Sequence, residues 1–306
     1  MSTITTGNEA RLLQEGLNSV FGQAYGKHEK QYGMIFDEGT SQKAFEQDQQ
    51  WEGFGLATAK PEGDSIAYDS QTEGISPKYV NVTYGKGFIV TEEAMEDQLY
   101  GVFNRKARAL AFSMNQTKEV VAANVLNNGF DSSFTMTGGD GLELFSTAHV
   151  NGPSDPTTHS NKLAIDADLT ESSLEDLLIQ INQATDPRGL RIALQGVRLI
   201  VAPGNMYNAK RILGSQLQND TANNAINAIK ADNSLPGGYR VNNYLTDADA
   251  WFIKTNAPDG MKCFNRRKTR FEQDMDFGTS NMRFKATERY VFGWTDDRGM
   301  YGSQGA

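Results

Sequence analysis

The sequence of 306 residues predicts a mixed α+β fold. One long stretch, Thr91 to Asn128, has apolar residues at the spacing of an amphipathic helix. Another, Val197 to Ala202, is a short and nearly continuous apolar run of the kind that forms a buried strand. The 30 glycines and 8 prolines indicate many turns, which fit a fold with substantial β structure better than a helical bundle. With 38% hydrophobic residues, the chain can bury a core in one large or two modest domains.

Charge and cysteine content exclude several classes of function. The formal charge of −9 argues against nucleic acid or an anionic membrane as the main partner, because clustered Lys and Arg drive phosphate binding. Cys263 is the only cysteine, so the chain can form neither an internal disulfide nor a cysteine-based zinc site. No signal-peptide pattern and no run of about 18 apolar residues is present. We therefore expect a soluble protein made in a reducing cytoplasm.

The region before the long helix predicts a short amphipathic helix within residues 8–21, followed by a long polar β-hairpin. The hairpin turn is Gly63-Asp64 after Lys60-Pro61-Glu62, and its thinly alternating flanks are Leu56, Thr58, Ile66 and Tyr68. An isolated two-stranded ribbon is marginal in water, so this one must lean on the rest of the chain or on another copy. We expect residues 57–80 to serve assembly and not the subunit core, since ordering the backbone costs about 1–2 kcal/mol per residue.

The long helix is marked at both ends. Thr91 is a good N-cap, Glu92 and Glu93 complement the helix dipole, and Asn127-Asn128-Gly129 is a plausible stop. Gly101 is expected to break the helix, because glycine in a helix interior costs about 1 kcal/mol. The predicted apolar stripe consists of Met95, Leu99, Phe103, Ala107, Leu110, Met114, Val121 and Val125.

The second half of the chain predicts an αβα arrangement and then several strands. Residues 130–163 are expected to be irregular and rich in turns. A helix over residues 170–184 should bury Leu174, Leu177, Leu178 and Ile181, with Ser172 and Glu175 at the spacing of a capping box. A helix over 205–213 follows the buried strand, a polar loop is expected over 214–238, and Trp251 to Lys254 is a strand.

From Lys262 onward, short strands over residues 269–271, 282–286 and 290–294 are separated by turns at Gly278 and at residues 297–299. The aromatic residues of this part are expected to fill a sheet core: Phe264, Phe271, Phe277, Phe284, Tyr290, Phe292 and Trp294.

No established catalytic or cofactor-binding pattern is present. The run Gly138 to Gly141 lacks both the lysine of a phosphate-binding loop and the third glycine of a dinucleotide-binding turn. His149, Asp155 and His159 could be drawn as a metal site, but their spacing matches no known ligand pattern. No paired carboxylates are distinguished as catalytic, and we expect no metal and no cofactor.

The basic run Arg266-Arg267-Lys268-Thr269-Arg270 is the most strongly charged feature. On a regular strand Arg266, Lys268 and Arg270 would point to one face and Arg267 to the other. One interpretation is that this run contacts a polyanion on an inner surface. The favoured interpretation is that its side chains are solvated or form ion pairs between subunits.

Four groups of segments, in this order, resemble the major capsid proteins of tailed bacteriophages, a fold shared with encapsulins. GFGLATAKPEGDSIAYD followed by GFIVTEEAMEDQLYG is similar to the extended loop and spine helix of that family, and GLELFSTAH with HSNKL to the segment after the helix. LEDLLIQINQATDPRG with VRLIVAPGNMYNAKRIL resembles the core of the axial domain. RFKATERYVFGWTDDRGMYG resembles the closing strands of the peripheral domain.

The resemblance implies a domain layout. It consists of an N-terminal arm (1–50), an extended β-hairpin loop (51–90), a peripheral domain with the spine helix (91–164 and 259–306) and an axial domain (165–258). It implies intersubunit contacts by the extended loop at Lys60, Pro61, Glu62, Gly63, Asp64 and Lys78.

The resemblance also implies a structural protein with no enzymatic activity, found in the virion and made in the cytoplasm of a bacterial host. Hexamers and pentamers of such a protein would form an icosahedral shell around double-stranded DNA. Expected partners are further copies, portal and scaffold proteins, a decoration protein and a maturation protease. The alternatives are the shell of an encapsulin-type compartment and a hydrolase that uses the loop from His149 to His159.

Overall fold

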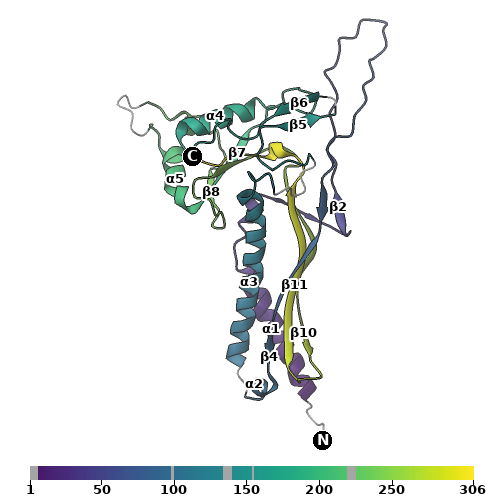
Figure 1. Cartoon of the computed structure of the whole chain (residues 1–306), viewed down its shortest axis with the longest axis vertical. Coiled ribbons are helices and arrows are strands. Elements are labelled where there is room, and N and C mark those ends of the chain that lie inside the picture. Colours follow the sequence, from purple (N-terminus) through teal and green to yellow (C-terminus); the bar gives the residue numbers. More distant parts are fainter. Residues whose placement is uncertain (1–5, 98–99, 134–139, 154, 219–224) are drawn as a thin grey trace.

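The structure is a computed structural model that describes residues 6–97, 100–133, 140–153, 155–218 and 225–306. Leu99, Gly138 and Gly139, which belong to the expectations above, lie outside these ranges, and so does the side chain of Met95. Figure 1 shows a broad head on a narrow stem, with one long loop projecting from the side of the head. No helix in the described ranges is both long and apolar enough to span a membrane.

The stem consists of two helices packed beside a four-stranded sheet. Helix α1 (Thr6–Gly26), longer than predicted, lies against α3 (Tyr100–Asn127). The sheet has the order β1-β10-β11-β4, in which only β1 and β10 are parallel. Its strands are β1 (Asp37–Thr40), β10 (Met261–Met275), β11 (Met282–Trp294) and β4 (Val82–Val90), and the 3₁₀ turn η1 (Tyr32–Met34) precedes β1.

The predicted apolar stripe holds the stem together. Phe103, Ala107, Leu110 and Met114 of α3 are buried against α1 and the sheet, which confirms this part of the stripe. Near the head, Val125 joins a larger core with Phe252, Phe292 and other buried side chains. Helix α3 has 28 residues, so at about 1.5 Å per residue it is a rod of about 42 Å that joins the two regions.

The long helical stretch is broken, but not at Gly101. The short helix α2 (Glu92–Glu96) is capped as predicted by Thr91, whose Oγ1 accepts a hydrogen bond from the backbone N–H of Ala94 at 3.4 Å. Helix α3 begins at Tyr100, so Gly101 lies in its first turn. The conformational-entropy cost of glycine applies to a helix interior, so Gly101 at the start of α3 does not interrupt the helix.

The head contains a second sheet with the order β12-β9-β7-β8. Its strands are β12 (Met300–Ser303), β9 (Trp251–Thr255), β7 (Gly196–Val201) and β8 (Tyr239–Val241). Helices α4 (Glu171–Asn182) and α5 (Met206–Gly214) pack on it, with the 3₁₀ turn η2 (Pro203–Asn205) before α5. The four inward-facing residues predicted for the first of these helices are all buried. Its capping box exists, but it is formed by Thr170 and Ser173, two positions before the predicted pair Ser172 and Glu175.

Three predictions for the second half of the chain need correction. Residues 130–163 are not wholly irregular, since β5 (His149–Gly152) and β6 (Asp155–His159) form a short antiparallel hairpin. The polar loop over 214–238 contains the short helix α6 (Ala228–Ala231), which Asn227 caps by accepting from the N–H of Lys230. The predicted strands after Lys262 merge into the two long strands β10 and β11.

The aromatic residues of β10 and β11 mostly fill the cores as predicted, with one exception. Phe284, Tyr290, Phe292 and Trp294 are buried, but Phe277 is 98% exposed. Phe277 lies in the turn between the two strands. Cys263 is completely buried in the main core, and burial raises the pKa of its thiol to about 12.

The chain closes where two backbones touch. Gly299, in the 3₁₀ turn η3 (Asp297–Gly299), lies against Gly260, which precedes β10. A Cβ on Gly299 would lie 2.5 Å from the Cα of Gly260. Only glycine permits this approach, which joins the end of the chain to the start of β10.

Candidate functional site

The projecting loop has no β ladder of its own. The strands β2 (Phe45–Gln47) and β3 (Lys78–Val80) pair at its root, and one bridge joins Trp51 to Glu73 farther out. The predicted hairpin strands around Leu56, Thr58, Ile66 and Tyr68 do not form in the single chain. The segment has too few apolar contacts to order two strands against solvent.

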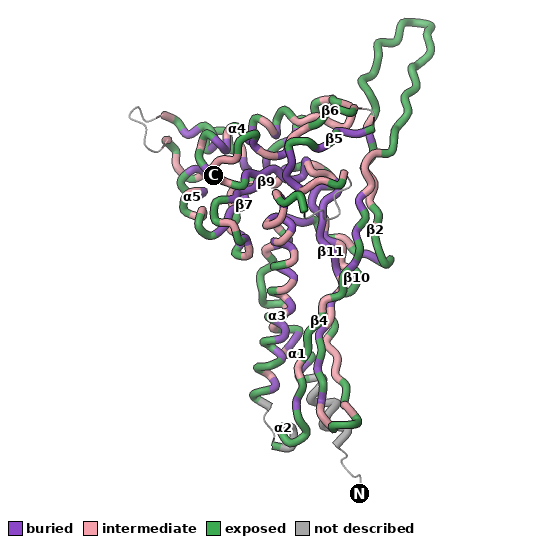
Figure 2. Tube along the Cα trace, in the orientation of Figure 1, coloured by how far each residue is buried: buried purple, intermediate pink, exposed green. Residues whose placement is uncertain are grey.

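Solvent surrounds the outer part of the loop. Figure 2 shows it exposed along both limbs, and every residue from 54 to 73 is exposed. Its apolar side chains are not covered either, since Leu56 is 81% and Tyr68 94% exposed. Exposed apolar groups of this size on an otherwise polar arm indicate a surface that meets another molecule.

The tip of the loop is the predicted turn. Gly63 has φ +88°, a left-handed conformation that favours glycine, and the N–H of Asp64 donates to the carbonyl of Pro61 at 3.3 Å. Lys60, Pro61, Glu62, Gly63 and Asp64 are therefore brought together at the farthest point of the loop. The charged side chains of Lys60, Glu62 and Asp64 have no hydrogen bond or ion pair within the described residues.

A clasp fixes the direction in which the loop leaves the body. Arg188, from the turn after α4, donates to the Oδ2 of Asp69 at 2.6 Å and to the carbonyl of Ser70 at 2.5 Å. Asp69 also accepts the N–H of Gly55 at 2.8 Å, so one carboxylate joins both limbs. The backbone N–H groups of Gly55 and Ser70, together with Arg188, hold the pKa of Asp69 below its usual value.

The return limb belongs to the subunit body from about residue 75 onward, which corrects the expectation for residues 57–80. Tyr79 is fully buried, packs against Phe264 and shares a 2.6 Å hydrogen bond with Thr295. Lys78 lies in β3 with its Nζ 4.2 Å from the centre of the Phe45 ring, so it is not part of the projecting loop. A buried tyrosine with a satisfied hydroxyl anchors this limb.

The basic run does not follow the predicted alternation. The pairing of β10 with β11 shifts register between Asn265 and Arg267 and again between Arg267 and Arg270, and such bulges re-aim side chains. Arg266, Arg267 and Lys268 are consequently all exposed. Arg270 pairs with Glu272 at 3.2 Å, whereas Arg267 only donates to the hydroxyl of Thr287 at 2.9 Å.

Each of the two histidines of the candidate metal site lies within hydrogen-bond distance of a carboxylate. His149 and His159 face each other across β5 and β6, with ring centres 5.6 Å apart. His149 Nδ1 lies 2.5 Å from Oδ2 of Asp140, and His159 Nε2 lies 2.7 Å from Oδ2 of Asp297. Asp155 instead bonds to Thr157 and Asn151, so the predicted trio does not converge.

The electrostatics of this cluster are unusual. Burial opposes a charged imidazole, but the hydrogen bond to Asp140 and the charges of Asp297 and Asp140 outweigh burial and raise the pKa of His149 to about 9. Burial likewise opposes the charge of Asp297, yet the hydrogen bond from His159 and the charge of His149 hold its pKa well below the usual range. The cluster therefore binds the β5-β6 hairpin to η3 by charge.

Arg298 extends this cluster and is itself buried. Its Nε donates to the carbonyl of Thr185 at 2.7 Å and its Nη2 to Oδ1 of Asn151 at 3.0 Å. Within the described ranges, no three or more His, Cys, Asp or Glu side chains are arranged to hold a metal ion. The donors and acceptors of the cluster are occupied by one another, as in a structural network.

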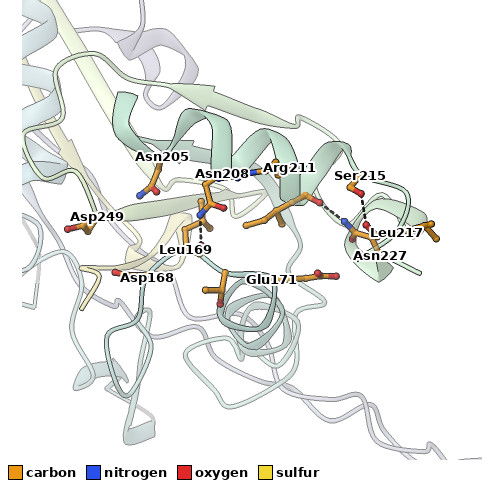
Figure 3. Close-up of a pocket in the computed structure, with 12 residues that line it drawn as sticks. Asp168, Leu169, Glu171, Asn205, Asn208, Arg211, Ser215, Leu217, Asn227 and Asp249 are labelled. Carbon is orange, nitrogen blue, oxygen red and sulfur yellow. Dashed lines mark hydrogen bonds between the residues drawn. The ribbon is translucent and has the colours of Figure 1, made fainter. Parts of the chain in front are cut away.

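A cavity of about 560 Å³ lies in the head beside α5. Figure 3 shows side chains of α5 on one side of it and the segment leading into α4 on the other. Asn208 donates to the carbonyl of Leu169 at 2.6 Å and Asn227 to that of Ile212 at 2.5 Å. The asparagine amides that line the cavity thus donate hydrogen bonds to backbone carbonyls of the same chain.

Sequence reasoning located the loop tip and the basic run but missed the clasp and the ion-pair cluster. Arg188 and Asp69 are separated by 119 positions, and His159 and Asp297 by 138. No local pattern links such residues. The available signals were the charged residues at 186–189, where the predicted helix over 170–184 ends, and those of the predicted turn over 297–299.

Comparison with known proteins gives a family and a fold. The family described as phage capsid protein matches residues 76–303. No curated protein matches the chain.

Among solved structures, the chain is similar to the capsid of a native GTA particle (TM-score 0.57, 12% identity, 90% of this chain and 89% of that chain covered). It is also similar to the procapsid of bacteriophage JBD30 (0.55, 14%, 98% and 76%) and to a virus-like particle from Pyrococcus furiosus (0.51, 12%, 94% and 98%). At these identities the likeness shows the fold.

Proposed function

Because the chain belongs to the phage capsid protein family, we propose that it assembles as hexamers and pentamers into an icosahedral shell around double-stranded DNA. The chain is a structural protein of the virion capsid and not an enzyme. What we propose beyond the family assignment is the assembly into hexamers and pentamers and the enclosure of DNA.

The observation that carries the proposal is the family match together with a loop that its own subunit does not support. The match covers residues 76–303, most of the chain. The loop exposes all residues from 54 to 73, including apolar side chains that water disfavours. In a closed shell each copy would meet the same surface of its neighbour, and repeated contacts of one kind generate rings.

The proposal assigns a part to each region. The stem and the β5-β6 hairpin (91–164 and 259–306) act as the peripheral domain, with α3 as the spine helix, and the rest of the head (165–258) as the axial domain. A core around α4, β7 and β9 supports the axial domain. The core around α3 and β11 also includes Ile200 and Phe252 of the head sheet, and β12 pairs with β9, so the two proposed domains share one continuous boundary. Residues 1–50 serve as the N-terminal arm and 51–90 as the extended loop, although β4 within the latter also completes the stem sheet.

The test is shell formation by the purified chain and by two loop variants. In one variant a short Gly-Ser linker replaces residues 54–68, and in the other a Gly-Ser segment of equal length replaces them. Both leave Asp69 and Tyr79 in place, so the subunit should unfold cooperatively as before. We expect closed particles from the unaltered chain by negative-stain microscopy and none from either variant.

The equal-length variant separates the reach of the loop from the contribution of its side chains. Normal shells from the short variant would refute the role of the loop. Unfolded subunits from both variants would show that the loop belongs to the subunit core.

One observation favours a second candidate. The likeness to the virus-like particle from Pyrococcus furiosus covers 98% of that chain. The second candidate function is therefore the shell of an encapsulin-type compartment that encloses no genome. The contents of particles isolated from the native source decide between the two, since the capsid proposal requires DNA. Portal, scaffold and decoration proteins and a maturation protease are proposed partners of the capsid.

A further inference from the structure

We propose that the basic ridge, defined as Arg266, Arg267 and Lys268, binds the acidic loop tip of a neighbouring copy, defined as Glu62 and Asp64. This inference rests on the proposed function, because it requires two copies to meet in a shell. It goes beyond that function by naming the surface on which the loop ends.

The ridge is a set of positive charges without negative partners. Arg266 and Lys268 have no hydrogen bond or ion pair among the described residues, and Arg267 bonds only to a neutral hydroxyl. Three other cations of the same hairpin are paired with acids in the subunit: Arg270 and Lys285 with Glu272, and Arg283 with Asp276. Arg289 donates to the carbonyl of Asn81. The register shifts in β10 expose three consecutive charges that a regular strand would divide between its faces.

The loop tip is the matching set. Glu62 and Asp64 are exposed and unpaired, on either side of the left-handed Gly63, and outnumber Lys60, the one cation of the tip. Of the other acids of the outer loop, Asp69 is already bound by Arg188, and Glu73 lies near the base at the bridge to Trp51. The clasp therefore directs the loop outward while leaving the two tip carboxylates available.

A neighbouring copy fits the ridge better than nucleic acid does. Proteins that bind DNA through phosphates commonly make about 6–10 such contacts, whereas the ridge offers three cations on a chain of net charge −9. Complementary charges set the register and the partner of an interface more than its strength. Two carboxylates meeting a three-residue ridge would therefore fix where the loop lands, while its apolar side chains add contact area.

The test is exchange of charge between the two surfaces. The ridge variant carries Arg266→Glu and Lys268→Glu, the tip variant carries Glu62→Lys and Asp64→Lys, and a third protein carries all four changes. All four side chains are exposed, so each variant should fold, which circular dichroism and thermal unfolding will check. We expect the ridge and tip variants to lower the yield of closed shells at least tenfold and the fourfold variant to recover to within about twofold.

A matched control is Arg270→Glu, which changes the same charge on the same strand at a residue already paired within the subunit. It should assemble to within about twofold of the unaltered chain. Higher salt should weaken assembly of the unaltered and the fourfold proteins alike, because exposed charges are screened over about 8 Å at physiological ionic strength.

The outcomes are distinguishable. If the fourfold variant fails to recover while the unaltered chain forms shells and the loop-replacement variants do not, the proposed function stands and this contact is refuted. If the ridge variant forms normal shells that retain less DNA, the ridge faces the genome and the proposal is wrong. If the unaltered chain forms no shells, both the function and the contact fail.

Discussion

Raising the pH from 6.5 to 9 should destabilise the subunit through His149. This side chain is fully buried and pairs with Asp140, and its pKa rises from 6.5 to about 9 on folding. A raised pKa stabilises the folded state fully below pH 6.5, and the stabilisation is lost as the pH rises through 9. Each pKa unit corresponds to about 1.4 kcal/mol, so the free energy of unfolding should decrease by about 3 kcal/mol over this interval.

The measurement is guanidinium unfolding of unassembled subunits at several pH values between 6 and 9. Two protein concentrations should be compared, since assembly would add a concentration-dependent stabilisation. His149→Gln removes the titrating group, so this variant should be about 3 kcal/mol less stable than the unaltered chain at pH 6 and lose little more by pH 9. His28→Gln is the matched control, because His28 is exposed and contacts only the ring of Phe112.

Two results would contradict this reasoning. A flat stability profile for the unaltered chain would mean that His149 stays neutral in the folded subunit despite Asp140 and Asp297. An unchanged slope in His149→Gln would assign the pH dependence to another group. The upper limit of pH 9 is chosen because the ordinary pKa is 9.0 for Cys263 and 10.0 for the buried tyrosines, so their ionisation in the unfolded chain reduces stability mainly above this pH.

Two further changes test the stem and the clasp. Leu110→Pro should remove a helical hydrogen bond from the middle of α3 and cost about 3 kcal/mol or more, while Leu110→Met should cost less than about 1.5 kcal/mol; soluble shells from the proline variant would contradict the helix. Arg188→Ala should release the loop and speed cleavage after Glu62 by a glutamate-specific protease in the unassembled subunit, with Arg191→Ala, at a nearby exposed arginine, as control. Equal cleavage rates would mean that the clasp does not hold.

Elements with a strong local pattern were predictable from the sequence. The buried face of α4, the strand β7 and most of the α3 stripe follow from periodicity, and the cap at Thr91 follows from residue type. The helix boundaries near Gly101 were not predictable, because the free-energy cost of a glycine depends on whether it lies at the end or in the interior of a helix. A local pattern indicates the secondary structure that a segment can form, but it does not determine which other segments pack against it.

The parts of the candidate site that could be predicted are those formed by residues adjacent in the sequence. The tip turn at Gly63 is encoded by adjacent residues, and the structure has it. The alternation of the basic run failed because a bulge depends on the partner strand β11, which no short window contains. Tyr79 appeared to belong to a polar ribbon, yet a tertiary hydrogen bond to Thr295, 216 positions away, places it in the body.

The buried Cys263 determines how the chain responds to redox conditions. The reactive form of a cysteine is the thiolate, and burial in the main core, with the pKa of the thiol raised to about 12, keeps Cys263 protonated and shielded from oxidants. A disulfide between two copies would require the core around Phe292 to open first. The thiol of Cys263 should therefore stay reduced when the assembled protein passes from a reducing cell to an oxidising exterior. No reductant should be needed to prevent disulfides between subunits.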